Sequence, residues 1–180
     1  MRELFVDRNK RIAIYEDLFT LQERLEFFDF ANKSYFTIGW ADSIDPGQEK
    51  YRSLHSSYSQ QDINNLGIIE KIKNSQAAIE LDSYVLSKAI LNLSVPSDIN
   101  FIHAHPESKV LLYYVNLNWQ EGWHGETLFF DESNKNIVFA NAYTPGALIA
   151  FDASIPHTIR PQSYVAEHYR FTLSLFFNKC

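Results

Sequence analysis

The sequence predicts a mostly β protein, a double-stranded β-helix or jelly roll with supporting N-terminal α-helices. From residue 83 to the end, short apolar runs and period-two patterns alternate with turn residues, which gives eight candidate strands. Before residue 83, apolar side chains recur at the spacing of amphipathic helices. Eight antiparallel strands in two sheets make a jelly roll, so we expect the helices to pack on the outside of the barrel.

The clearer of two predicted helices covers residues 18–31. Its apolar stripe, at steps typical of one helix face, consists of Leu18, Leu21, Leu25, Phe28 and Ala31. A short strand is expected over residues 34–43, and a serine-rich loop with a Pro-Gly pair over residues 43–59. Ser59 is placed to cap a second helix over residues 60–74, whose apolar stripe is weaker.

The strands are predicted from apolar runs that end at turn residues. They cover residues 84–95, 100–105, 110–117, 125–131, 136–143, 146–152, 156–162 and 170–177. The chain of 180 residues, with 46% hydrophobic and 15% aromatic residues, is long enough to bury one core. We therefore expect a single domain over residues 1–180, with mainly helical support and loops in 1–82 and the β-helix core in 83–180.

Composition limits the partners that the protein is expected to have. The formal net charge is -6, and acidic and basic residues are mixed along the chain without a basic stripe, so no nucleic acid partner is expected. No apolar stretch is long enough to cross a bilayer and the start has no apolar signal core, so no membrane association is expected. The only cysteine, Cys180, excludes an internal disulfide, and we expect a cytoplasmic protein.

Two histidines indicate a metal site. His103 and His105 are two residues apart in a predicted strand, so both side chains should point to the same face, into the barrel, together with that of Phe101. His157 follows one apolar strand and begins the next, which makes it the best candidate for a third ligand. A histidine pair on one strand with a distant histidine is the sequence form of a facial metal site that leaves positions open for ligands and oxygen.

Six segments between Tyr84 and Phe177, roughly half of the chain, carry a family resemblance. In order along the chain they are HAH (103–105), LLYYVNLNW (111–119), WHGETLFFD (123–131), YTPGALIAFD (143–152), PHTIRPQ (156–162) and YRFTLSLFF (169–177). These segments resemble the prolyl-hydroxylase-like branch of the iron(II)/2-oxoglutarate-dependent dioxygenases, and they occur in the order of that family.

The resemblance implies roles for individual residues. His103 matches the first iron ligand of the family and His157 the distal one. Arg170 matches the basic residue that binds the far carboxylate of 2-oxoglutarate, a task that suits a guanidinium because it meets a carboxylate with two parallel hydrogen bonds. Tyr114 matches a position from which a phenol donates to the same carboxylate, and Thr172 lies on the same strand face as Arg170 and could add a hydroxyl.

The chain departs from the family at the second ligand, which is usually an Asp or a Glu and here is His105. Three explanations are open: His105 itself binds, the ligand pair is shifted to His105 and Glu107, or the site is inactive. Strand geometry favours the first, with His103, His105 and His157 as the metal ligands, because Glu107 is expected in a turn and directed away from the pocket.

The expected function is a non-haem iron(II)/2-oxoglutarate-dependent hydroxylase with molecular oxygen as co-substrate. The cofactors implied by the resemblance are Fe(II) and 2-oxoglutarate, and the primary substrate is a small molecule or a peptide or sugar. Two alternatives are a three-histidine dioxygenase that does not use 2-oxoglutarate and a catalytically inactive, cupin-like binding module. The sequence predicts neither the identity of the substrate nor an oligomeric state.

Overall fold

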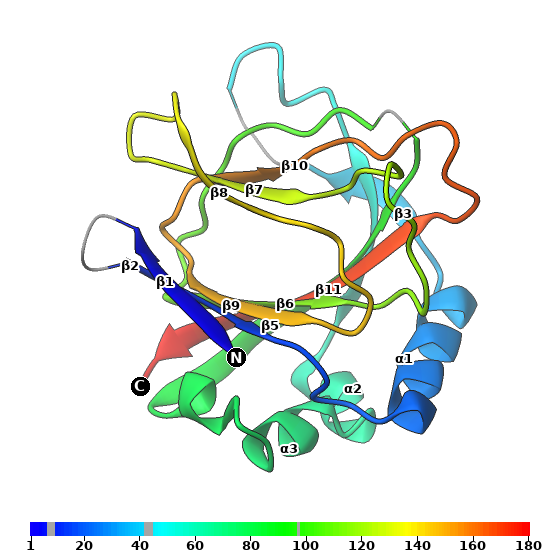
Figure 1. Ribbon diagram of the computed structural model, residues 1–180, viewed down its shortest axis with the longest axis vertical. Coiled ribbons are helices and arrows are strands. Elements are labelled where there is room, and N and C mark those ends of the chain that lie inside the picture. The colour runs from blue at the N-terminus through cyan, green and yellow to red at the C-terminus, as the bar shows by residue number, and fades with distance from the viewer. Residues whose placement is uncertain (7–9, 42–44, 97) are drawn as a thin grey trace.

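A computed structural model describes residues 1–6, 10–41, 45–96 and 98–180. Two antiparallel sheets face each other, and the α-helices lie on the outer side of the larger one (Figure 1). The larger sheet has eight strands in the order β1-β2-β9-β6-β11-β5-β4-β3, and the smaller has three in the order β10-β7-β8. The prediction of a mostly β jelly roll with helical support is therefore confirmed.

The strands of both sheets have the following bounds. They are β1 (Arg2–Val6), β2 (Lys10–Tyr15), β3 (Thr37–Trp40), β4 (Ser53–Tyr58), β5 (Tyr84–Ser94), β6 (Lys109–Tyr114), β7 (Thr127–Phe130), β8 (Ile137–Asn141), β9 (Leu148–Asp152), β10 (His157–Ile159) and β11 (Arg170–Lys179). The helices are α1 (Leu21–Lys33), α2 (Gln60–Asn65), α3 (Ile68–Lys73) and the 3₁₀ turn η1 (Ala78–Leu81). Within the described ranges no helix is long and apolar enough to span a membrane.

The helix predicted over residues 18–31 is present as α1, which begins at Leu21 because Thr20 caps it. The Thr20 hydroxyl accepts from the Glu23 backbone N–H, and the Glu23 carboxylate accepts from the Thr20 N–H at 2.8 Å, which is a complete capping box. Phe27 of α1 packs edge-on against Tyr113 of the larger sheet, with ring centroids 5.5 Å apart. This contact joins the helix to the sheet.

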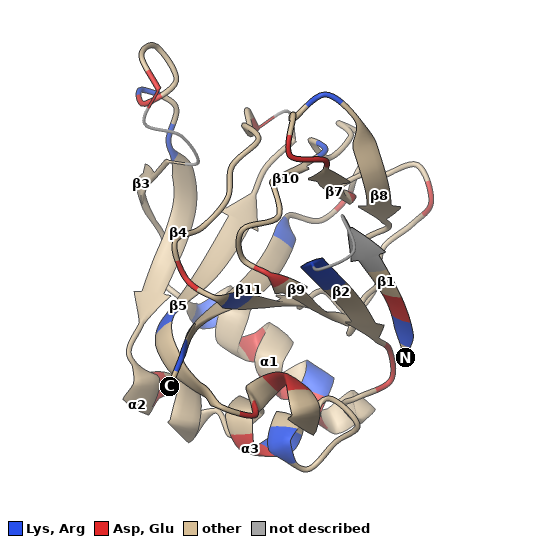
Figure 2. Cartoon of the chain, turned by 90° about the vertical axis from the view of Figure 1, so that its left-hand side faces the viewer, with Lys and Arg blue, Asp and Glu red and all other residues tan. Residues whose placement is uncertain are grey.

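The second predicted helix is divided into α2 and α3. Ser59 caps α2 as predicted, since its hydroxyl accepts from the Asp62 backbone N–H. The division falls at Gly67, which has φ = 68°, a left-handed conformation that ends the first helix and lets the chain begin the second. Figure 2 shows these helices under the large sheet, with acidic and basic residues side by side on α3.

Seven of the eight strands predicted after residue 83 are present. The prediction is wrong for residues 100–105, which are not a strand and form one isolated antiparallel bridge, between His103 and His157. The partner segment, β10, is only three residues long and also pairs with β7, so it offers little length for a further ladder.

Three strands before residue 83 were not expected. The prediction of a loop over residues 43–59 is wrong where β4 forms. Strand β4 pairs with the long strand β5 from Leu54 to Tyr58, and the hydrogen bonds of this pairing outweigh the preference of its serines for turns. Strands β1 and β2 were missed because β2 is buried on both faces and lacks a period-two pattern. Residues 42–44, at the end of the predicted strand 34–43 and the start of the predicted loop, lie outside the described residues.

The larger sheet has a hydrophobic core on each side. One core lies between this sheet and the helices and includes Tyr15, Phe27 and Tyr113. The other lies between the two sheets and includes Phe129 and Phe151. A cavity lined by residues of both sheets lies beside this second core.

A buried carboxylate ties η1 to the larger sheet. Glu80, 1% exposed, accepts hydrogen bonds from the Tyr15 hydroxyl and the Arg11 guanidinium, and its second oxygen lies 3.0 Å from Lys109 Nζ. Burial alone would raise the pKa of Glu80, but hydrogen bonds from Tyr15, Arg11 and Lys109 outweigh it and hold the pKa below its ordinary value. This network connects η1 to strands β2 and β6.

We predict that Glu80→Gln lowers the free energy of unfolding by about 3 kcal/mol, because it leaves the buried Lys109 and the partly buried Arg11 without this carboxylate. Urea unfolding at neutral pH measures this loss. The control is Glu23→Gln, which breaks the more exposed 2.8 Å ion pair with Lys71 and should cost less than about 1 kcal/mol.

The destabilisation caused by Glu80→Gln should also depend on pH. Because the pKa of Glu80 is depressed in the folded chain, its contribution to stability is present above the ordinary pKa of 4.5 and is lost as the pH falls through the folded-state pKa. The stability difference between wild type and Glu80→Gln should therefore shrink in acid. An equal difference at neutral and acidic pH would contradict the role given to the network.

Candidate metal centre

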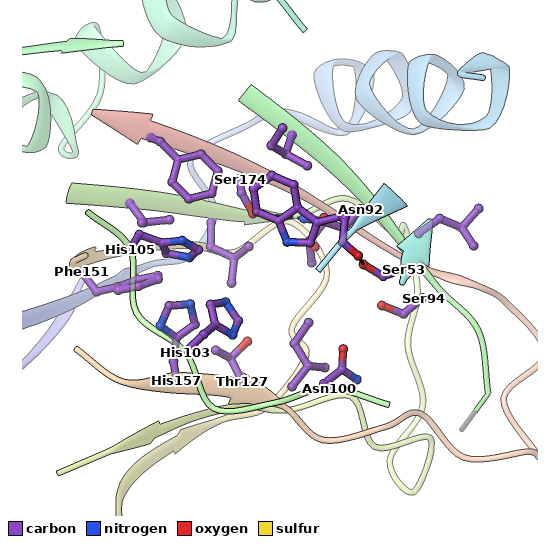
Figure 3. A pocket seen from close by; sticks show the side chains of 18 residues that line it. Ser53, Asn92, Ser94, Asn100, His103, His105, Thr127, Phe151, His157 and Ser174 are labelled. Atoms are coloured by element: carbon purple, nitrogen blue, oxygen red, sulfur yellow. Dashed lines mark hydrogen bonds between the residues drawn. The ribbon is translucent and has the colours of Figure 1, made fainter. Parts of the chain in front are cut away.

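Three histidines meet at one end of the space between the sheets. His103 and His105 lie in the extended segment before β6, and His157 is the first residue of β10. The backbone bridge aligns them, since the N–H of each of His103 and His157 donates to the carbonyl of the other, at 3.0 and 2.9 Å. Potential ligand atoms of all three lie within 4.8 Å of one another (Figure 3). The structure thus brings together the three histidines predicted as ligands.

The orientation of two of the rings is fixed by backbone carbonyls. Nδ1 of His103 lies 2.9 Å from the Phe101 carbonyl, and Nδ1 of His157 lies 2.9 Å from the Ile155 carbonyl. A carbonyl only accepts, so Nδ1 carries the hydrogen in each ring and the lone pair is on Nε2. Phe101 itself does not point into the site with the histidines as expected, because its ring packs against Tyr51, with centroids 5.6 Å apart.

The environment keeps two of the imidazoles neutral. Burial, followed by the neighbouring charges of His103 and His105, lowers the pKa of His157 well below its ordinary value. Burial, with the charges of His103 and Lys88, lowers the pKa of His105 to about 3. Neutral imidazole is the form that binds a metal, so neither ring has to lose a proton at neutral pH.

Apolar rings surround the three imidazoles. The Phe151 ring lies 4.9 Å from that of His157, and the Phe176 ring lies 4.8 Å from that of His105. Strand pairing fixes the position of Phe176, because this residue of β11 lies between Val110 of β6 and Lys88 of β5. The rings of Phe151 and Phe176 form an apolar wall of the site. Such a wall excludes water and strengthens electrostatic interactions inside the site.

Arg170, the predicted carboxylate-binding residue, is fully buried in the interior of the barrel. Its Nε donates to the Gly125 carbonyl at 3.0 Å, but neither of its terminal nitrogens has a hydrogen-bond partner. The guanidinium lies over the rings of Tyr114 and Tyr143, with Cζ 5.5 and 4.9 Å from their centroids. Burial lowers the pKa of Arg170, and no carboxylate among the described residues forms an ion pair with it.

The other two predicted residues lie beside this guanidinium. Tyr114 and Thr172 are direct partners in the pairing of β6 with β11. The Tyr114 hydroxyl is 2.7 Å from Thr127 Oγ1, whereas Thr172 Oγ1 is buried without a hydrogen-bond partner. Burial raises the pKa of Tyr114, so the phenol stays protonated and can donate.

A cavity of about 60 Å³ lies beside the three histidines. Its volume is several times what one water needs. Its polar lining at the mouth consists of Ser53, Asn92, Ser94 and Asn100 (Figure 3). Thr127 and Thr172 line its inner part, and the three histidines line one side. Arg170 and Tyr114 do not line the cavity; the Tyr114 hydroxyl contacts Thr127, and Thr172 is the strand-pairing partner of Tyr114.

Glu107, the alternative ligand, is not in the histidine cluster. It lies in the turn before β6, as expected, but its side chain is only 8% exposed and forms an ion pair with Lys88 at 2.9 Å. The expectation that Glu107 lies in a turn and is directed away from the pocket agrees with this position, because Glu107 is neither in the cluster nor in the lining of the cavity beside it. Its ion pair with Lys88 of β5 was not predicted.

Sequence analysis missed two residues that shape the site. Tyr143 stacks on Tyr114, with ring centroids 4.4 Å apart, and Thr127 lies between Tyr114 and the cavity. Thr127 lies two residues before the buried Phe129 in β7 and therefore on the same face, so a search for inward-facing positions could have found it. Tyr143 lies just beyond β8, which ends at Asn141; it was included in the predicted strand 136–143 and in the motif 143–152, but neither assigned it a role in the site.

No protein-family model matches the sequence, and no curated protein matches it. Solved structures do match. A 2OG-Fe(II) oxygenase family oxidoreductase from Burkholderia pseudomallei is 10% identical at a TM-score of 0.67, over 96% of this chain and 86% of that one. HygX from Streptomyces hygroscopicus, with nickel and 2-oxoglutarate bound, is 9% identical at a TM-score of 0.65, over 93% of this chain and 82% of that one.

A third match is the viral collagen prolyl hydroxylase vCPH from Paramecium bursaria Chlorella virus-1, in a 2-oxoglutarate complex. It is 16% identical at a TM-score of 0.61, over 94% of this chain and 96% of that one. The chain therefore has the fold of the 2-oxoglutarate- and iron(II)-dependent oxygenases, prolyl hydroxylases among them.

We predict that Gly125→Ala disturbs Arg170. Gly125 has φ = 84°, and a Cβ there would lie 3.1 Å from Arg170 Cδ and 3.4 Å from Trp119. Gly122, with φ = 85° and nothing within 4 Å, is the matched control. Gly122→Ala should cost about 1 kcal/mol of unfolding free energy from backbone strain. Gly125→Ala should cost about 1–2 kcal/mol more from overpacking; equal losses in urea unfolding would contradict a close fit around Arg170.

Proposed function

We propose that the protein is a non-haem iron(II)/2-oxoglutarate-dependent oxygenase that hydroxylates its substrate. The observation that carries this proposal is the buried Arg170, a cation whose terminal nitrogens are unpaired in the same barrel interior as three clustered imidazoles. Burying such a cation without an anion is unfavourable, so the site is suited to a ligand that brings a carboxylate.

The residues present fit both iron and 2-oxoglutarate. Imidazoles are ligands that suit iron(II), and His103, His105 and His157 would hold it. Arg170, with Tyr114 and the unpaired hydroxyl of Thr172, would hold the far carboxylate of 2-oxoglutarate. When bound, these two groups supply the activated oxygen, while the protein supplies orientation and a dry site.

The chain's own residues would have distinct tasks in this reaction. The Phe101 and Ile155 carbonyls keep the His103 and His157 rings with Nε2 free. The Phe151 and Phe176 rings keep water away from the imidazoles. The amide and hydroxyl groups at the mouth of the cavity offer hydrogen bonds to the substrate.

The substrate is proposed to be a small molecule or a residue of a peptide or sugar that enters at this mouth. Ser53, Asn92, Ser94 and Asn100 are uncharged, and Trp40 adds an aromatic face beside them. These groups would bind a neutral polar group by hydrogen bonds and stacking. We also propose a reducing, cytoplasmic setting, in which the exposed Cys180 remains a free thiol.

A second candidate is a three-histidine dioxygenase that binds its substrate directly and does not use 2-oxoglutarate. One observation favours it, since the cluster holds His105 where the family has a carboxylate. Arg170 would then bind a carboxylate of the substrate. The iron form distinguishes the two functions, because only chelation by the 2-oxo acid should produce a weak visible charge-transfer band when 2-oxoglutarate is added.

We predict that the anaerobic iron(II) form develops this band with 2-oxoglutarate, and that Arg170→Met weakens binding of 2-oxoglutarate roughly 30- to 100-fold by removing charge-assisted hydrogen bonds. Iron binding itself should persist in Arg170→Met and be lost in His157→Ala. The matched control is Arg160→Met, because Arg160 is half exposed and paired with Glu126. Its band should equal that of wild type.

Two results would count against the proposal. Iron bound without a band, at any concentration of 2-oxoglutarate, would favour the second candidate. Wild-type protein that binds no iron would leave a barrel that only binds a ligand or a partner. In aerobic turnover with a primary substrate, succinate should form only when both iron(II) and 2-oxoglutarate are present.

A further inference from the structure

The three imidazoles are not held equally. His103 and His157 each have Nδ1 placed on a backbone carbonyl, whereas neither ring nitrogen of His105 has a hydrogen-bond partner among the described residues. Metal-binding histidines usually donate their second N–H to a carbonyl or a carboxylate, which fixes the ring and raises its basicity. His105 is therefore a ligand candidate without this support.

A buried carboxylate with a free oxygen lies two residues further along. Glu107 lies in the bend that follows His105, and both residues are partly buried whereas residues 104, 106 and 108 are exposed. Its side chain is 8% exposed, and its Oε2 is buried without a hydrogen-bond partner. The unpaired donor and the unpaired acceptor thus belong to neighbouring side chains.

Lys88 holds this carboxylate against the wall of the site. Its Nζ is 2.9 Å from one Glu107 oxygen, and it lies 4.7 Å from the ring centroid of Phe176 and 5.4 Å from that of Trp40. Phe176 is the cross-strand partner of Lys88 and also contacts the His105 ring. The ion pair therefore lies directly behind the wall that His105 packs on.

We propose that Glu107 is a positioning residue of the metal centre, whose free Oε2 accepts the ring N–H of His105 when a metal is bound. Lys88 pairs with the other oxygen, which leaves Oε2 free. The two groups are not bonded in the structure, so the proposal requires the His105 ring and the carboxylate to turn toward each other when the metal binds. This inference rests on the proposed function, since it requires a metal at the three histidines.

The test is Co(II) binding to the metal-free full-length chain, followed by visible absorption. Glu107→Ala should weaken Co(II) binding roughly 10- to 100-fold, as loss of an orienting partner does in other metal sites. Glu107→Gln should bind more tightly than Glu107→Ala, because the amide oxygen still accepts a hydrogen bond. Lys88→Met should bind at least as tightly as wild type, because the carboxylate is then free to turn to His105.

Proton NMR of the Co(II) form adds a readout that a purely structural role would not change. Each bound imidazole has one exchangeable ring N–H, and in the wild type that of His105 should be protected by Glu107. In Glu107→Ala the His105 signal should be lost through fast exchange while those of His103 and His157 remain. Glu23→Gln, which breaks an ion pair of similar length away from the site, should leave both affinity and spectrum unchanged.

The outcomes separate this inference from the proposed function. Wild-type affinity in both Glu107 variants would overturn the inference and leave the proposed function intact. A loss in Lys88→Met as large as that in Glu107→Ala would also overturn it, since the ion pair would then act only by supporting the wall. Absence of Co(II) binding by the wild type would overturn both. Should Glu107→Ala not fold, Glu107→Gln and Lys88→Met decide the question.

Discussion

Two backbone hydrogen bonds between His103 and His157 hold the site together, because they join the extended segment before β6 to the first residue of β10. The carbonyl that orients each ring belongs to the residue two positions before its histidine, Phe101 in one segment and Ile155 in the other. Each segment thus fixes its own ring, and the bridge fixes the distance between them. The geometry of the imidazoles follows from backbone pairing, with side-chain packing as a second support.

Arg170, in contrast, lowers the stability of the folded chain. A fully buried guanidinium with two unpaired nitrogens loses hydration that the Gly125 carbonyl and the faces of Tyr114 and Tyr143 only partly replace. A core selected for stability alone would place an apolar residue at the start of β11. The chain instead surrounds the cation closely, so that a Cβ at position 125 would lie 3.1 Å from Arg170 Cδ. Such local cost is typical of a site that is completed by its ligand.

The sequence predicts the parts of this site that follow from its ordered motifs, although the strand expected over residues 100–105 is reduced to a single bridge. It identified His103, His105 and His157 as neighbours, and Arg170, Tyr114 and Thr172 as a group, and the structure brings both sets together. It did not identify β4, whose serines are held by the neighbour β5, nor the contact between Glu107 and Lys88. Both depend on which strand lies beside which, a relation between distant segments that local propensity and periodicity do not contain.

The charge of the site links its unusual ligand set to its buried cation. With a carboxylate at position 105, a divalent metal, Arg170 and a dianionic 2-oxo acid would sum to zero; with the neutral His105 they leave one positive charge. Glu107 is the carboxylate nearest along the chain, but Lys88 neutralises it. The excess charge and the unpaired guanidinium therefore act in the same direction, and both strengthen the binding of an anion in a dry cavity. In either candidate function the ligand that completes this site is a carboxylate, and the two functions differ in whether that carboxylate belongs to the co-substrate or to the substrate.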